Sequence, residues 1–254
     1  MKLTMKEVKM QFLDSAYIGD FLFRYLHILV GITWIGLLYY FNLVQVPGLA
    51  AYGDEGKARM ITLDKIARRA LWWFRYASLA TLGTGLLMTG IIENYWTRSG
   101  DAHKYTISLG MIIGTLMAAN VWMIIWKNQK VVLANAVNVL GGAAADPAAA
   151  VAGRKALLGS RQNFIFSTSM LWFMVGPAHY YNQAFGDATS SNALTLLIIG
   201  LVIVAILQIN ALGLLGGTAA TNKLLWPYES HKNALISSGA LWLILMIAAE
   251  VLLK

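Results

Sequence analysis

The chain of 254 residues is 58% hydrophobic and 13% charged, has no cysteine and carries a net charge of +8. This composition is typical of an integral membrane protein. The positive charge indicates basic loops of the kind that orient such a protein in the membrane, and we do not expect nucleic-acid binding. The lack of cysteine excludes disulfides, thiolate metal sites, iron–sulfur clusters and a c-type haem held through a C-x-x-C-H motif.

Residues 1–17 predict an interfacial lead-in, because MKLTMKEVKMQFLDSAY alternates charged with apolar residues and lacks the apolar core of a cleavable signal peptide. Beyond it, apolar runs recur at about the 20 residues that a helix needs to cross the hydrocarbon core. Six spans are predicted, at Ile18–Val44, Leu71–Ile92, Ile107–Trp126, Asn163–Tyr181, Ala193–Leu215 and Leu235–Leu253. We therefore predict an all-α polytopic transmembrane helical bundle over residues 18–253, within a single membrane domain of residues 1–254.

Two connections are long enough to contain helices. Residues 58–74, ARMITLDKIARRALWWF, predict a surface helix that runs into the second span. Residues 131–161 predict a short helix on either side of a break at an Asp-Pro pair.

Thirteen of the twenty Lys and Arg residues lie in or beside the first, third and fifth connections. The positive-inside rule then places these connections in the cytoplasm and both termini outside. This topology fits a multi-pass protein of the bacterial inner (cytoplasmic) membrane.

Two of the four histidines, His27 and His179, fall inside predicted spans. His103 falls in an external loop and His231 at the cytoplasmic edge of the last span, where water can hydrate both. An imidazole at membrane depth is costly and usually has a partner or a function. Both buried histidines are predicted in the outer half of the bilayer, which is the arrangement that axial ligation of a haem b requires.

The neighbours of the two histidines are consistent with a haem. Gly31 and Gly176 have no side chain, so each leaves space beside one imidazole on the same helical face, where a flat macrocycle could lie. Arg24 could meet a propionate, and Trp34 and Trp172 provide aromatic walls. A hydrogen-bonded structural histidine pair and a proton relay are the alternatives.

Other polar residues at membrane depth are Asn120, Gln208 and Asn210, which we expect to bond to neighbouring helices, with a quinone or substrate pocket as the alternative. The motif Gly110-x-x-x-Gly114 predicts a close helix contact. The sequence contains no phosphate-binding Gly loop, nucleophile elbow or carboxylate pair, so hydrolase and nucleotide-binding functions have no support.

Three runs resemble the membrane domain of the bacterial urate hydroxylase family (the urate oxidase N-terminal domain). They are HILVGITWIG at 27–36, GTLMAANVWMIIWKNQK at 114–130 and SRQNFIFSTSMLWFMVGPAHYY at 160–181. The first span alone also resembles the haem-binding membrane protoporphyrinogen oxidases. The likeness to the urate hydroxylases implies a redox membrane protein, with haem at His27 and His179 and with urate as its substrate.

The sequence departs from that family at Lys127, where proline is expected, and in lacking a C-terminal cytochrome c domain. The expected function is therefore that of a haem b protein for electron transfer, a possible oxidoreductase. Its iron would be held by His27 and His179, and a separate cytochrome c or a quinone would be its redox partner. The alternative is a non-catalytic accessory or assembly subunit of a larger membrane respiratory or oxygenase complex, with structural histidines.

Overall fold

The computed structural model of the chain describes residues 18–91, 95–96 and 99–254, and every regular element within them is helical. The predicted lead-in at 1–17 lies outside the described residues. The main elements are α2 (Phe23–Tyr39), α3 (Val46–Ala51), α4 (Gly56–Thr62), α5 (Arg68–Ile91), α6 (Asp101–Ala119), α7 (Lys127–Leu140), α8 (Pro147–Gly176), α9 (Asn182–Ala184), α10 (Ser190–Ala211), α11 (Trp226–Glu229) and α12 (His231–Leu252).

Short wide-turn segments join several of these elements into long rods. They are η2 (Ile18–Leu22), η3 (Tyr40–Gln45), η4 (Leu63–Ala67), η5 (Asn120–Trp126) and η6 (Pro177–Tyr181), and a 3₁₀ turn, η7 (Lys223–Leu225), precedes α11. The rod of α6, η5 and α7 has 40 residues, or about 60 Å at 1.5 Å per residue. That is about twice the thickness of a hydrocarbon core, so part of this rod extends beyond any membrane that it crosses.

Among the described residues, four helices are long and apolar enough to cross a membrane: Asp20–Ala51, Asp101–Leu140, Ser190–Ala211 and His231–Leu252. The described part of the chain is thus all-helical, with four candidate membrane-crossing helices. The rods that contain α5 and α8 are as long as these but more polar.

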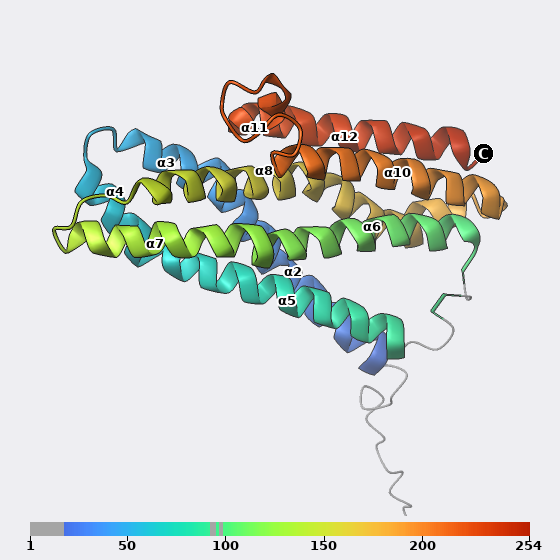
Figure 1. The fold of residues 1–254 in the computed structure, drawn as a ribbon. Coiled ribbons are helices and arrows are strands. Elements are labelled where there is room, and N and C mark those ends of the chain that lie inside the picture. The colour runs from blue at the N-terminus through green and yellow to red at the C-terminus, as the bar shows by residue number, and fades with distance from the viewer. Residues whose placement is uncertain (1–17, 92–94, 97–98) are drawn as a thin grey trace, which may run out of the picture.

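The polarity of α8 has a structural cause, because α8 is the central helix and its polar side chains point toward neighbouring helices. It packs against α6, α7, α12 and η5 (Figure 1). Asn163 donates to the Met117 carbonyl of α6 at 2.9 Å, and Thr168 bonds to Ser238 of α12 at 2.8 Å. A helix surrounded by protein can carry polar groups that lipid would not tolerate.

The predicted contact at Gly110 and Gly114 is confirmed. A Cβ atom built at Gly110 would lie 2.6 Å from the carbonyl oxygen of Phe173 in α8, and one at Gly114 would touch Met174 at 3.5 Å. Glycine at 110 therefore permits the close approach of α6 to α8.

The structure alters two expected boundaries. The fifth predicted span extends to Leu215, but α10 ends at Ala211, and the chain then turns through Gly213 in the left-handed region with φ 77°. The helices predicted on either side of the break at 141–146 do form, as α7 and the first half of α8, but they continue the rods of α6 and the rest of α8. The helix predicted over 58–74 also forms and runs into α5.

Helices α2 and α5 form a hairpin that packs mainly on itself. The two helices lie side by side, and the N-terminal end of α2 and the C-terminal end of α5 diverge from the other helices (Figure 1). This hairpin carries His27.

Candidate functional site

His27 lies on α2 against α5, and its imidazole is partly buried. Its Nδ1 is 3.1 Å from the Thr84 hydroxyl oxygen. The ring occupies the space that a side chain at position 85 would take, because a Cβ built at Gly85 would lie 3.3 Å from His27 Cε1. Thr84, through its hydroxyl, and Gly85, through its missing side chain, together position the imidazole against α5.

The hydrogen bonds of Thr84 favour one tautomer of His27. The Thr84 hydroxyl oxygen lies 2.8 Å from the Ala80 carbonyl oxygen and 3.0 Å from that of Thr81, and either carbonyl can accept its proton. When the hydroxyl donates to one of these carbonyls, its oxygen accepts from His27 Nδ1–H, and Nε2 of the neutral ring carries the lone pair. Metal-binding histidines typically have this arrangement.

The other residues predicted around His27 have protein contacts of their own. Arg24 forms an ion pair with Asp20 one turn earlier. A Cβ at Gly31 would be 3.9 Å from the Thr81 methyl group of α5. Trp34 is 2% exposed, and its indole Nε1 is buried without a hydrogen-bond partner.

His179 lies in η6, and its side chain is exposed. The space beside Gly176 holds the ring of Tyr181, 3.2 Å from the position of a Cβ, and the Tyr181 hydroxyl accepts from Trp172 Nε1 at 2.8 Å. The structure therefore does not bring His27 and His179 into one cluster, since the first packs against α5 and the second is exposed at the end of α8. His103 and His231 lie in the first turns of α6 and α12.

An apolar groove with a volume of about 400 Å³ lies along the C-terminal third of α8, between α2 and α12. Its lining residues are Tyr39, Thr168, Leu171, Trp172, Val175 and Trp242. Two hydroxyls at the groove have protein partners: Tyr39 bonds to Ser167 at 3.1 Å and Thr168 to Ser238. His179 follows Val175 by about one helical turn, so it lies close to one end of the groove.

The expected helix-to-helix bonding of the buried amides is confirmed. Asn120 of η5 and Gln208 of α10 exchange two hydrogen bonds, at 3.0 and 2.7 Å, and Asn120 also donates to Asn163 of α8 at 2.9 Å. Asn210 donates to the Leu224 carbonyl at 2.7 Å. Gln162, next to Asn163, is fully buried with neither amide atom bonded. Asn120, Gln208 and Asn163 thus join η5, α10 and α8, whereas Asn210 bonds to the connection that follows α10.

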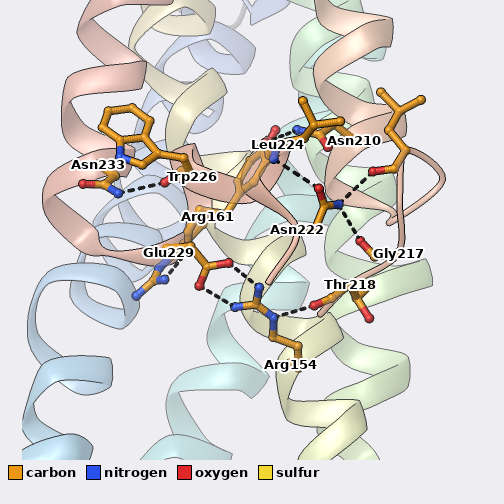
Figure 2. Close-up of polar contacts among 12 residues, drawn as sticks. Arg154, Arg161, Asn210, Gly217, Thr218, Asn222, Leu224, Trp226, Glu229 and Asn233 are labelled. Atoms are coloured by element: carbon orange, nitrogen blue, oxygen red, sulfur yellow. Dashed lines mark hydrogen bonds and ion pairs between the residues drawn. The ribbon is translucent and has the colours of Figure 1, made fainter. Parts of the chain in front are cut away.

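Sequence reasoning missed a charged cluster that holds the connection between α10 and α12, residues 212–230, against α8 (Figure 2). Arg154 donates through both terminal nitrogens to the Glu229 carboxylate, and its Nε donates to the Thr218 carbonyl at 2.9 Å. Arg161, which is 5% exposed, donates to the Tyr228 carbonyl. Glu229 is the only acidic residue of the connection, and this feature of the sequence could have indicated an ion pair with a basic residue.

Comparison of the chain with protein-family models, with curated proteins and with solved structures finds no match. Within the described residues, no group of three or more His, Asp or Glu side chains could hold a metal ion. Haem iron needs only one or two protein ligands, since the porphyrin supplies four. The chemistry of His27 is therefore the most informative feature of the site.

Loss of the Glu229 charge is expected to loosen the connection. Glu229→Gln should lower the melting temperature in detergent by about 3 °C, because a partly exposed ion pair contributes about 1 kcal/mol. The double variant with Arg154→Met should lose little more, since both changes remove the same pair. Asp187→Asn, an exposed acid elsewhere, is the control. Additive losses in the double variant would contradict a coupled pair.

Proposed function

We propose that this chain is a six-helix integral membrane protein that binds one haem b and transfers electrons, with His27 as an axial ligand. The observation that supports it best is the contact of His27 Nδ1 with the Thr84 hydroxyl. With the Thr84 proton on the Ala80 carbonyl, the hydroxyl oxygen accepts from Nδ1–H and Nε2 of the neutral imidazole is available to iron.

Six crossing helices are part of this proposal. The four apolar helices supply four, and α5 and α8 supply the other two. Helix α5 packs beside α2, and α8 packs among α6, α10 and α12. Each of the two therefore lies alongside helices that are apolar enough to cross a membrane, and it would cross at the same level. The basic first, third and fifth connections would face the cytoplasm, with both termini outside.

His179 is the second axial ligand in this proposal. Its side chain is exposed, and within the described part of the chain it makes no hydrogen bond that would have to break on binding iron. Since His27 and His179 do not contact each other, ligation by both requires the divergent end of the α2–α5 hairpin to approach η6. A haem held by His27 alone would have an open sixth position.

The haem would supply one-electron chemistry, while the chain would orient the iron through His27 and exclude water. The electron partner would be a separate cytochrome c or a quinone. The groove at Tyr39 and Trp172 supports a quinone, because it is apolar and aromatic, and its lining residue Val175 precedes His179 by about one turn. Oxidation of urate or a related purine at the bacterial inner membrane is the reaction that the resemblance suggests.

A spectrum of the purified full chain tests the proposal. We expect a b-type reduced-minus-oxidised difference spectrum with about one haem per chain. Addition of urate should reduce that haem if urate is a substrate. Purified protein that has been supplied with haem and shows no such spectrum would refute haem binding, whereas a spectrum without reduction by urate would refute only the urate reaction.

The accessory-subunit alternative is supported by the divergent α2–α5 hairpin, which exposes large apolar side chains such as Phe21, Ile32 and Leu86. These side chains could pack against lipid or against another membrane subunit. Co-purification in a stable complex without stoichiometric haem would favour this alternative.

A further inference from the structure

Arg75 of α5 has no anionic partner among the residues that the structure describes. Its guanidinium lies 3.7 Å from the centre of the Trp126 ring and 5.1 Å from that of Tyr76. Its Nε is buried without a hydrogen bond, and no described carboxylate or carbonyl accepts from its other nitrogens. Arg75 is partly exposed and lies just inside the predicted second span, so it sits where a lipid headgroup meets the hydrocarbon.

Aromatic rings fix the position of this guanidinium. Tyr76 packs edge-on against Trp122 of η5 at 5.7 Å, and it also contacts Trp72 at 4.8 Å. Cation–π contact with Trp126 holds the positive charge without neutralising it. The charge therefore remains available to an anion.

An apolar groove of about 220 Å³ begins one turn beyond Arg75, between α5 and the rod of α6 and η5. Its lining residues are Leu79, Leu82, Thr115, Ala118, Ala119, Trp122 and Met123. Leu79 and Leu82 follow Arg75 at spacings of four and seven residues, so the groove extends about 10 Å along the same face of α5, away from the basic connection. The small side chains of Ala118 and Ala119 contribute to its depth.

We infer that this arrangement is a binding site for an anionic phospholipid, with the phosphate on Arg75 and one acyl chain in the groove. The charge of Arg75 lies at the end of the apolar groove nearer the basic connection. A phospholipid has the same order, with its charged headgroup at the membrane surface and its acyl chains in the interior. The nearby charges also favour an anion. Lys127, next to Trp126 in the chain, is exposed, whereas Asp64 is already paired with Lys65 and Arg68. A zwitterionic lipid would bring a cationic headgroup into this positive region.

Lipid retention by the purified full chain tests the site. Native mass spectrometry would compare phosphatidylglycerol with phosphatidylcholine of the same acyl chains. We expect wild type to bind phosphatidylglycerol about tenfold more tightly, as one charge-assisted contact allows, and Arg75→Gln to remove this preference. Arg75→Lys should keep part of it. Ala119→Leu, which fills the groove, should weaken both lipids.

Arg69→Gln is the matched control, because Arg69 is an exposed cation on the same helix outside the groove, and it should leave the preference unchanged. Equal retention of the two lipids by wild type, or an undiminished preference in Arg75→Gln, would overturn the site. Binding of inorganic phosphate as tight as that of phosphatidylglycerol would also overturn it, since the acyl groove would then contribute nothing. A melting curve checks that each variant is folded, and Arg75→Lys tests the charge if the glutamine variant is not.

Discussion

Replacing His27 with alanine is expected to abolish the b-type absorption of the purified protein. The substitution removes the imidazole that would hold iron through Nε2 while Nδ1 bonds to Thr84. The haem content and the reduced-minus-oxidised spectrum measure the effect. A haem content in His27→Ala equal to that of wild type would exclude His27 as a ligand.

Two further variants separate ligation from a structural role of the histidine. Thr84→Val removes the acceptor for Nδ1 and should weaken haem retention by about 10- to 100-fold without abolishing it, as is typical for loss of such a partner. His179→Ala should shift the spectrum from low-spin to high-spin if His179 is the second ligand. If Thr84→Val lowers only the melting temperature, the contact between His27 and Thr84 is purely structural.

Replacing Gly110 with alanine is expected to cost about 3 kcal/mol of stability, which is large for a single methyl group. The new Cβ would lie 2.6 Å from the Phe173 carbonyl oxygen, and a backbone atom of the central helix cannot move away as a side chain can. Helix α6 would have to separate from α8. The melting temperature in one detergent, compared with wild type, measures the loss.

Gly114→Ala is the matched control, because its Cβ would meet only side-chain atoms at ordinary contact distances, Met174 at 3.5 Å and Met170 at 3.7 Å. It should change the melting temperature little. Gly200→Ala should be intermediate, since its close neighbour is the side chain of Leu109 at 2.8 Å, which can adopt another rotamer. Equal losses at 110 and 114 would contradict the packing of α6 on α8.

Most of the helical architecture could be predicted from the sequence. Apolar runs of membrane length indicate helices, and each of the six predicted spans falls largely within a helical rod. The extension of the rods beyond those runs could not be predicted in the same way. In residues 131–161, alanine-rich sequence is compatible with separate short helices and with continuous rods, and only packing of α7 on α8 distinguishes them.

The candidate site was predictable only in part. The sequence singled out His27 because an imidazole is rare among apolar residues, but it could not identify Thr84, which is 57 residues away. The expected open spaces beside Gly31 and Gly176 depended on what neighbouring helices place there, and the structure places Thr81 and Tyr181. Arg154 and Arg161 were interpreted as loop charges, because nothing local indicates that Glu229 and the Tyr228 carbonyl come close.

The sequence by itself determined the all-helical class, the absence of thiolate chemistry and the choice of His27 and His179 as candidates. These follow from composition and from hydrophobic length, which are properties of the chain alone. The tertiary structure decided the contact of His27 with Thr84, the separate surroundings of the two histidines and the pairing of Arg75 with Trp126. Each of these depends on contacts between residues distant in sequence, which form only when the helices pack.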